Sequence, residues 1–407
     1  MINNIMKGTL VAAIFICMLG CQAGKLTAQG NARPVVLALN AQALERNKSA
    51  IKNNNAELMP AYKQLIKDAD KALKWGPYSV MEKTNNPPSG DKHDYMSLAP
   101  YFWPDSSKAD GLPYIRKDGQ TNPEVKDYKD KDYMPKLCDN VQTLALAYYF
   151  SDNNLYAEHA ARLLKVWFLD PETKMNPNLN FAQAIKGKND GRGAGLIDSR
   201  HFVKLIDGIM LLKTSPNWKP ADQQGMQRWF ADFLNWMQTS KTGMDELKAK
   251  NNHGAWYDAQ RLALALYIDS TQLAKNIVSN ATLRLDKQMD DAGSFPAEME
   301  RTISLHYTTF VMDAFFTIAQ MSGKTGFDFW NYTTPSGKSL KKGFTVLKPF
   351  ITLEQNWEGE QIKEYDKEDG YMLLMEGAEH YKCRDCVQAV QQLADDKAPR
   401  LRLKLLY

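Results

Sequence analysis

Residues 144–155 read LALAYYFSDNNL and residues 262–273 read LALALYIDSTQL, so the two stretches align without a gap. Each carries an apolar run, a short polar segment and then a returning apolar residue. Around the first stretch, apolar residues recur at spacings of 3 and 4, at Leu137, Val141, Leu144 and Tyr148 and then at Tyr156, Ala160, Leu163 and Trp167. Such spacing predicts amphipathic helices on both sides of a polar turn. The repeated unit is therefore a helical hairpin.

Helical periodicity extends over much of the chain. Further helical candidates are 41–75, 197–214, 221–240, 305–322 and 368–395. Strand-like alternation is scarce, with short candidates such as 343–352. No linker rich in Pro, Gly or Ser divides the chain, which favours one large all-α domain. Hairpins laid side by side, each with an inner and an outer helix, form either an open solenoid or a closed ring, the α/α toroid.

Composition excludes some functional classes. The chain is 44% hydrophobic and 24% charged, as in ordinary soluble globular proteins, and its net charge is +4. No block of lysine and arginine marks a nucleic-acid surface, so no nucleic-acid partner is expected. The mild positive bias is compatible with an anionic substrate.

The N-terminus predicts export. An apolar run (GTLVAAIFICMLGC) ends at Leu19-Gly20-Cys21, which resembles the cleavage box of bacterial lipoproteins, and the run is too short to span a bilayer as a mature helix. We therefore expect a signal peptide over 1–20, lipidation of Cys21 and a tether over 21–35. The alternative is an ordinary secretory signal cut near Ala28. Either way the protein leaves the cytoplasm, and lipidation predicts an outer-membrane lipoprotein facing the periplasm or the cell surface.

Three cysteines remain beyond the predicted signal and lipid site: Cys138, Cys383 and Cys386. The CRDC stretch at 383–386 is compatible with a local disulfide in an oxidising compartment. One CxxC is not a zinc site, and a redox role would require a strand-to-helix setting that the sequence does not show.

Long loops rich in Asn, Gly, Pro and aromatic residues interrupt the helices. They cover 93–104 (HDYMSLAPYFWP), 111–123 (GLPYIRKDGQTNP) and 176–200. Loops of this length inside a compact domain are more often functional than idle.

The stretch NNHGAWYDAQ at 251–260 stands at the start of a predicted helix. An asparagine there can cap the helix, which accounts for either Asn251 or Asn252 but leaves His253 unexplained. A helix N-terminus carries free N–H groups and positive partial charge, so it favours a bound carboxylate. The stretch therefore predicts an anion site.

A second cluster is EMERTISLHYTTF at 298–310. Tyr307 lies on a helical stripe with Ile303 and Phe310 and could be a core aromatic. However, Arg301 and His306 are close to it, and nearby positive charge favours a phenolate. Tyr307 is therefore a candidate for proton transfer.

These motifs resemble a family. NNHGAWYD, followed about fifty residues later by ER-(x)5-Y, is similar to the alginate lyase superfamily of polysaccharide lyases, and SLAPYFWPD at 97–105 resembles the aromatic cleft segment of that family. The absence of an obvious C-terminal β-sheet domain favours polysaccharide lyase family 38 over the oligoalginate lyases. The resemblance implies an α/α toroid, an incomplete barrel of helical hairpins with long loops over the cleft, and a single catalytic domain over 36–407. It also implies cleavage of uronic-acid polymers by β-elimination.

The resemblance also implies roles for the motif residues. Asn252, His253 and Arg301 would neutralise the C6 carboxylate before a base removes the C5 proton and an acid protonates O4. For mannuronate and glucuronate the two groups lie on the same side, so Tyr307 could serve as both base and acid. For guluronate they lie on opposite faces, and His253 could be the base with Tyr307 as acid. The scheme requires no metal and no cofactor.

The substrate-binding candidates are basic or aromatic residues for carboxylates and sugar rings, together with one acid. They are Arg200, His201, Tyr95, Tyr101, Trp103, Trp256, His306 and Glu300. Arg192 could assist Arg200 with carboxylates. The expected partner is an anionic polysaccharide. The protein itself is expected to be a monomer that is attached to the membrane through its lipid anchor.

Three alternatives remain open. The first is a lyase with the same scaffold whose substrate is glucuronan and not mannuronate-rich alginate. A glycan-binding outer-membrane lipoprotein would share the signal and the helices without catalysis. A glycoside hydrolase on the same toroid would require two carboxylates at a set separation, for which the candidates are Asp198, Glu298 and Glu300.

Overall fold

The computed structural model describes residues 33–407 of the chain. The predicted signal peptide, Cys21 and most of the predicted tether therefore lie outside the described residues. Helices dominate the described part, and its four strands are all short. No described helix combines the length and the apolar character that a membrane span would need.

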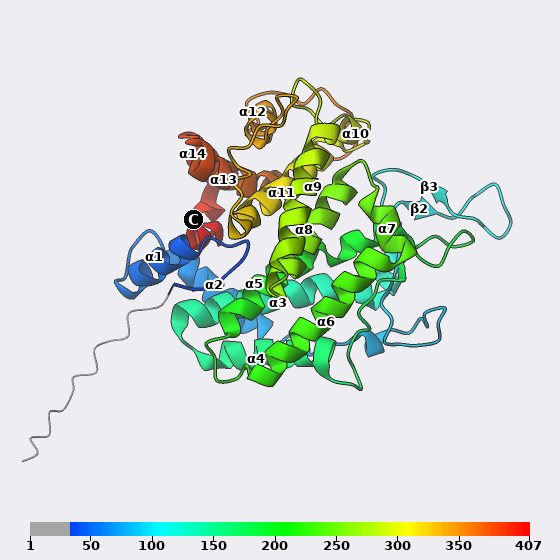
Figure 1. The fold of residues 1–407 in the computed structure, drawn as a ribbon, viewed down its shortest axis with the longest axis horizontal. Helices are drawn as coiled ribbons and strands as arrows, with labels where there is room; N and C mark the ends of the chain where they lie inside the picture. The colour runs from blue at the N-terminus through cyan, green and yellow to red at the C-terminus, as the bar shows by residue number, and fades with distance from the viewer. Residues whose placement is uncertain (1–32) are drawn as a thin grey trace, which may run out of the picture. The chain divides into compact units, whose positions relative to one another are not determined.

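The two repeated stretches form helical hairpins, as predicted (Figure 1). The first hairpin consists of α3 (Lys129–Ser151) and α4 (Asn154–Leu164), and the second of α8 (Asn252–Tyr267) and α9 (Thr271–Gln288). Each turn contains an aspartate with a left-handed backbone, Asp152 (φ 56°) or Asp269 (φ 59°), a conformation that Asp tolerates better than most residues. The polar turn is therefore the part of the repeat that reverses the chain.

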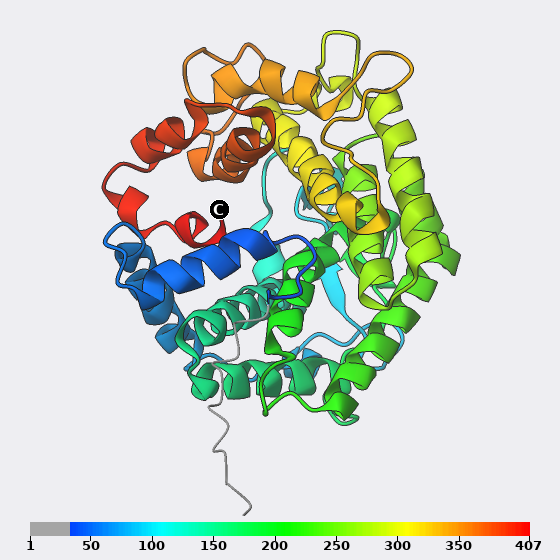
Figure 2. The same ribbon diagram turned by 60° about the vertical axis from the view of Figure 1, so that its left-hand side comes forward.

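The hairpins and their neighbours form a ring of inner and outer helices within residues 33–407 (Figure 2). On the inner side, α3 packs against α5 (Phe202–Leu212), and α8 packs against α11 (Ser304–Ser322). Nearly every residue of α8 and α11 is buried, as expected of helices covered on all sides. This arrangement is the predicted α/α toroid. The remaining α-helices are α1 (Ala41–Lys52), α2 (Met59–Ala72), α6 (Pro220–Thr239), α7 (Lys241–Leu247), α10 (Pro296–Met299), α12 (Leu340–Ile351), α13 (Tyr371–Tyr381), α14 (Cys386–Ala394) and α15 (Leu403–Leu406).

The strand candidate at 343–352 is wrong, because this segment lies in helix α12. Leu340, Phe344, Leu347 and Ile351 are buried at a 4-3-4 spacing, which places one apolar face of a helix against the core. Local alternation of apolar and polar residues made the segment look strand-like, but its apolar face packs as a helix.

The long loops contain the few strands of the described residues. Strand β1 (Met96–Leu98) pairs in parallel with β4 (Phe181–Ala184), and β2 (Phe102–Trp103) pairs in antiparallel with β3 (Ile115–Arg116). Figure 1 shows β2 and β3 in a loop region close to α7. Two short pairings thus hold together loops that the sequence left without secondary structure.

Both ends of the described chain are tied into the ring. Asp207 of α5 accepts hydrogen bonds from the backbone N–H groups of Leu37, Ala38 and Leu39. Helix α1 lies beside α15, and the Asn47 amide donates to the carbonyl oxygens of Lys404, Leu405 and Tyr407 at 3.0–3.3 Å. These polar contacts fix the segments that close the ring.

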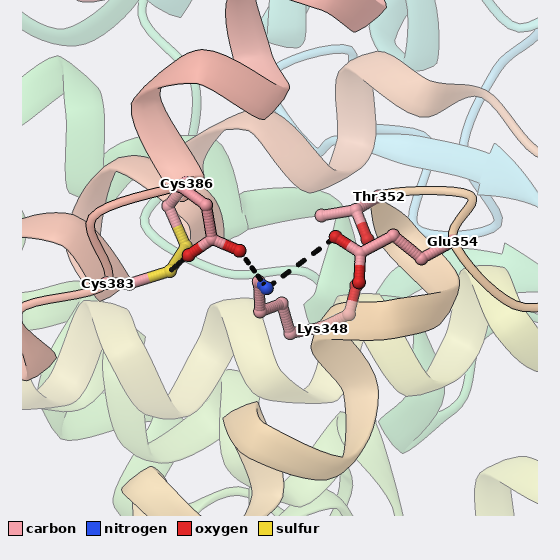
Figure 3. The surroundings of a disulfide bond; sticks show 6 residues. Lys348, Thr352, Glu354, Cys383 and Cys386 are labelled. Carbon is pink, nitrogen blue, oxygen red and sulfur yellow. Dashed lines mark hydrogen bonds and ion pairs between the residues drawn. A yellow bond between two sulfur atoms is a disulfide. The ribbon is translucent and has the colours of Figure 1, made fainter.

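The CRDC stretch forms a disulfide between Cys383 and Cys386 at the turn from α13 to α14 (Figure 3). Beside it, Lys348 of α12 forms an ion pair with Asp385 and lies 3.6 Å from the Glu354 carboxylate. Cys138 is a buried free thiol. The local disulfide, which the sequence left open, is therefore present in the structure.

Candidate active site

A cavity of about 1160 Å³ lies among the inner helices and the long loops. All four residues with predicted catalytic roles line it, although they come from two motifs, one at the start of α8 and one that leads into α11. Six of the eight substrate-binding candidates also line it. The ten residues are Asn252, His253, Arg301, Tyr307, Arg200, His201, Tyr101, Trp256, His306 and Glu300.

Tyr95 and Trp103 do not line the cavity. Tyr95 is fully buried, and its hydroxyl donates to Asp198 Oδ2 at 3.0 Å, so it is a core residue and not a sugar platform. Trp103 lies on β2, where its indole N–H donates to the Gln120 carbonyl at 2.9 Å. Sequence alone did not distinguish an aromatic ring that supports a loop from one that faces a ligand.

The NNHG segment is the N-terminus of α8. Asn251 is the N-cap, and its side chain accepts from the backbone N–H of His253 at 3.3 Å. Asn252 has a different partner, because its side-chain amide donates to Glu298 Oε2 at 2.8 Å and its backbone N–H donates to Oε1 of the same carboxylate. Burial raises the pKa of Glu298, and these two donors oppose that effect. Capping thus explains Asn251, whereas Asn252 links α8 to the segment before Arg301.

His253 is oriented by a carboxylate that the sequence analysis missed. Its Nδ1 lies 2.7 Å from Oε1 of Glu246, a buried residue near the end of α7. Within residues 33–407, the other ring nitrogen has no hydrogen-bond partner. A histidine held through Nδ1 presents Nε2 for proton transfer or for hydrogen bonding to a ligand.

Arg301 is held by the loop at 111–123. Its guanidinium donates to both oxygens of Asp118, at 2.7 and 3.0 Å. Burial would raise the pKa of Asp118, but the hydrogen bonds from Arg301 and from the backbone of Thr302 outweigh it and hold that pKa well below its usual range. Arg301 also lies over the Tyr307 ring, 3.6 Å from its centroid. Asp118 therefore fixes the cation that stands against Tyr307.

Tyr307 donates its hydroxyl proton to the hydroxyl of Tyr101 at 2.9 Å. Burial raises the pKa of Tyr307, and the opposing effect of Arg301 is smaller. The expectation that nearby positive charge makes this phenol more acidic than usual is therefore wrong for the substrate-free site. Desolvation disfavours the phenolate more strongly than one cation favours it.

The two other histidines that line the cavity lie in different surroundings. His306 Nδ1 lies 2.8 Å from Asp369 Oδ2, and its ring stacks on Phe310. His201 is different, because burial, reinforced by the neighbouring cations, lowers its pKa to about 2. His201 is therefore a neutral hydrogen-bonding group and not a cation for carboxylates.

Two cavity-lining arginines have no carboxylate within 4 Å among the described residues. Arg200 donates to the Ile197 carbonyl at 3.2 Å and lies over the Phe310 ring, and Arg192 donates to Gln183 Oε1 at 2.8 Å. Burial lowers the pKa of both guanidiniums without neutralising them. Because a half-buried charge without a counter-ion is costly, both residues are suited to receive an anion.

The carboxylates proposed for a hydrolase are not arranged as a catalytic pair. Asp198 is buried outside the cavity lining and accepts from Tyr95, Ser97 and Gln183 while pairing with Lys131. Glu298 is engaged by Asn252, and only Glu300 lines the cavity. The three carboxylates proposed for this alternative therefore do not form the facing pair that a hydrolase requires.

Two groups of side chains in the described part of the chain have donor atoms within 4.8 Å of one another, as a metal site would need. The first is Cys383, Asp385 and Cys386, whose sulfurs form the disulfide. The second is Glu376, Glu379 and His380 on α13. Neither group contains a predicted catalytic residue.

Comparisons with known proteins agree with the fold and with the residues that line the cavity. Residues 79–357 match the family model for alginate lyase. An alginate lyase from Bacteroides ovatus is 39% identical, with a TM-score of 0.87 over 92% of this chain and 99% of that one. Alginate lyase A1-III from Sphingomonas species A1 is 16% identical, with a TM-score of 0.51 over 84% and 94%, and shares the fold. No curated protein matches the chain.

The ring of helical hairpins, the match to the family model and the 39% identical alginate lyase together identify an α/α-toroid polysaccharide lyase. Within that class, the chain belongs to the alginate lyase family.

Proposed function

We propose that the protein cleaves alginate, with a preference for mannuronate-rich chains, by β-elimination in which Tyr307 is both base and acid, and that it belongs to family 38. The observation that carries this proposal is the gathering of Asn252, His253, Arg301 and Tyr307 around one cavity. Unsaturated uronate ends are the expected product.

The chemistry requires three events at one sugar residue. Tyr307, as phenolate, takes the C5 proton, the electrons form the C4–C5 double bond, and the C4–O4 bond breaks. The same phenol then returns a proton to O4, so that protons balance over the cycle. Arg301, against the Tyr307 ring, stabilises both the phenolate and the negative charge that develops on the C6 carboxylate. Because burial raises the pKa of Tyr307, the rate is expected to rise as the pH increases above neutrality.

His253 gives the proposal its link to substrate stereochemistry. With Nδ1–H donated to Glu246, Nε2 of the protonated ring can donate to the C6 carboxylate of mannuronate, whereas Nε2 of the neutral ring can act as the base for guluronate. Arg192 and Arg200 are the unpaired cations that would bind carboxylates of neighbouring sugars. Tyr101, Trp256 and His306 offer rings to the polymer, and a glucuronan would be handled by the same syn elimination as mannuronate.

The experiment is an ultraviolet assay for unsaturated uronate with polymannuronate, polyguluronate and glucuronan as separate substrates. Tyr307→Phe is expected to lower the rate on the best substrate by about 10²- to 10⁴-fold, the range for loss of a general acid–base. The matched control is Tyr257→Phe, which removes another buried hydroxyl, bonded to the Met237 carbonyl, outside the cavity lining. It should retain the rate within about twofold, since it does not touch the site.

Each outcome of the assay bears on a different part of the proposal. Full activity of Tyr307→Phe would overturn the tyrosine mechanism, and faster cleavage of glucuronan than of polymannuronate would overturn the substrate preference. Binding of the polymers without any absorbance change would favour the glycan-binding lipoprotein.

We further propose that the protein is an exported outer-membrane lipoprotein carrying lipid on Cys21. The support is the sequence Leu19-Gly20-Cys21 after a short apolar run. Labelling of cells with a radioactive fatty acid should mark the wild-type protein and leave Cys21→Ser unlabelled. Equal labelling of both, or of neither, would contradict lipidation at this residue.

A further inference from the structure

Two side chains of α9 donate hydrogen bonds to the backbone of residues 247–251, the segment that leads into α8. Arg284 Nη2 donates to the Leu247 carbonyl at 2.9 Å, and its Nη1 donates to the Ala249 carbonyl at 2.7 Å. One helical turn later, the Gln288 amide donates to the Asn251 carbonyl at 3.0 Å. Three of the five carbonyl oxygens of 247–251 are thus bound by one face of α9.

A buried carboxylate fixes the guanidinium of Arg284. Its Nε donates to Asp258 Oδ2 at 2.7 Å, and Asp258 is fully buried on α8. Arg284 therefore bonds α8 through Asp258, the end of α7 through Leu247 and the connection between them through Ala249. A planar fork with five N–H donors can hold several acceptors at set angles, which an ammonium group cannot do.

The glycine of the NNHG motif is required by this arrangement. A Cβ atom on Gly254 would lie 2.1 Å from Arg284 Nη1 and 2.3 Å from the Ala249 carbonyl oxygen. Both distances are far below van der Waals contact, and the second involves backbone that cannot simply rotate away. The space beside Gly254 is thus occupied by the guanidinium and the carbonyl that it binds.

The carbonyl groups that Arg284 binds lie between Glu246 and His253 in the sequence, and Glu246 is the residue that orients His253. Glu246 directly precedes Leu247, whose carbonyl is one of the free groups at the C-terminus of α7 and is well placed to bind a cation. His253 is the second residue of α8 and lies only two residues after Asn251. The 2.7 Å contact between Glu246 and His253 therefore spans the very segment that Arg284 and Gln288 hold.

We propose that Arg284 is a positioning residue of the active site, assisted by Gln288, which acts through 247–251 to keep His253 paired with Glu246 and facing the cavity. Neither Arg284 nor Gln288 lines the cavity, so neither touches the substrate. As a statement about catalysis this inference rests on the proposed function, whereas as a statement about the histidine geometry it does not.

The test compares Arg284→Lys with Arg261→Lys. Arg261 is the matched control because it faces the same Asp258, 3.8 Å from Nη1 to Oδ1, but bonds Gln238 and not the 247–251 segment. Both variants retain the positive charge near Asp258. Only Arg284→Lys removes the fork that binds Leu247 and Ala249.

Two readouts are measured on each folded variant. The first is kcat and KM on the best uronan substrate, and the second is the downfield proton resonance of the His253 Nδ1–H bonded to Glu246, assigned with His253→Gln. Arg284→Lys is expected to lower kcat about 10- to 100-fold with KM within about twofold, since a displacement of about 1 Å can have that effect, and to lose the resonance. Arg261→Lys should retain both.

The outcomes separate this inference from the proposed function. Retention of kcat and of the resonance in Arg284→Lys would overturn the inference, as would equal losses in both variants. If the wild type has no lyase activity, the proposed function fails while the resonance still tests the positioning. If Arg284→Lys does not fold, Gln288→Met takes its place, because it removes only one hydrogen bond. This variant should weaken the same resonance. An unchanged resonance would count against the proposal.

Discussion

The hairpins α3–α4 and α8–α9 share sequence and frame, yet only the second carries the candidate catalytic motif. Extending their ungapped alignment toward the N-terminus places Pro135 opposite His253 and Met134 opposite Asn252. In α3, which begins at Lys129, these positions lie within the helix, whereas α8 begins at Asn252. The apolar repeat therefore builds the frame, and the point at which the inner helix begins decides whether the frame presents free N–H groups and polar side chains.

The outer helices differ in the same way. The alignment places Val166 opposite Arg284, and Val166 lies in the Lys165–Leu169 segment that follows α4. The first hairpin thus has no cation at the position from which Arg284 binds the carbonyl groups ahead of α8. The comparison indicates that the N-terminus of α8, which carries the candidate catalytic residues, needs hydrogen bonds from α9, the other helix of its hairpin.

The largest expected effect is the difference between His253→Ala and Pro135→Ala. Removing the imidazole should lower kcat about 10²- to 10⁴-fold if it takes part in proton transfer or carboxylate binding. Pro135→Ala should leave the rate within about twofold and maintain or raise thermal stability, because alanine restores a helical N–H. Comparable rate losses in both variants, measured by the same ultraviolet assay, would remove the functional distinction between the hairpins.

The second prediction tests their structural equivalence. Leu144 and Leu262 occupy matching positions and are both fully buried. Each leucine-to-alanine change should lower the free energy of unfolding by about 2–5 kcal/mol, from lost burial and from the cavity left behind. Urea unfolding of the two variants provides the measurement. A cost below about 1 kcal/mol at one site alone would show that the two frames are not equivalent.

The third prediction concerns buried carboxyls on the helices beside the two inner helices. Asp207, on α5 beside α3, accepts three backbone N–H groups, whereas Asp313, on α11 beside α8, has an Oδ1 atom without a partner among residues 33–407. Burial raises the pKa of Asp313 to about 7. Because this value exceeds the unfolded one, the folded state binds more protons between about pH 4 and 7, and stability falls as the pH rises through that window.

Asp313→Asn should remove this part of the pH dependence. At pH 8 the variant should be more stable than the wild type by up to about 4 kcal/mol, and the difference should shrink toward pH 4. Thermal unfolding at a series of pH values is the measurement. A constant difference between the two proteins across that range would contradict the assignment of the titration to Asp313.

The smallest effect is expected at a third hairpin, α13–α14, whose turn is closed by the Cys383–Cys386 disulfide (Figure 3). Such a short loop gains only about 2 kcal/mol from cross-linking in the chain-entropy model. Replacing both cysteines by serine should therefore lower the unfolding free energy by no more than about that amount. The lyase rate should not change, because neither cysteine lines the cavity. A loss of activity without unfolding would contradict a purely structural role.

The helices were predictable because their apolar residues recur at helical spacing, and the two motifs were predictable because poor helix formers and rare histidines gathered in them. Helix α12 was misjudged since local alternation of apolar and polar residues concealed the buried stripe. Tyr95 and Trp103 were misplaced because an aromatic side chain in a loop has no sequence feature that separates a core contact from a ligand contact.

The partners of the candidate catalytic residues were beyond the reach of the sequence. Asp118 lies 183 positions before Arg301 and meets it only because the loop at 111–123 folds against the segment that leads into α11. Glu246 is close to His253 in sequence, but the break between α7 and α8 removes the helical spacing from which their contact could have been inferred. Contacts between residues far apart in the sequence, and contacts across the end of a helix, were thus the ones that the sequence could not predict.

The contact between α1 and the last residues has a practical consequence for protein engineering. Tyr407 lines the cavity, its carbonyl is bound by Asn47, and its hydroxyl bonds Glu376. An affinity tag fused directly after Tyr407 would therefore emerge at the cavity wall and compete with these contacts. Purification and immobilisation handles belong instead in an exposed loop that does not line the cavity, such as the turn around Asn153 and Asn154, where added residues can point into solvent.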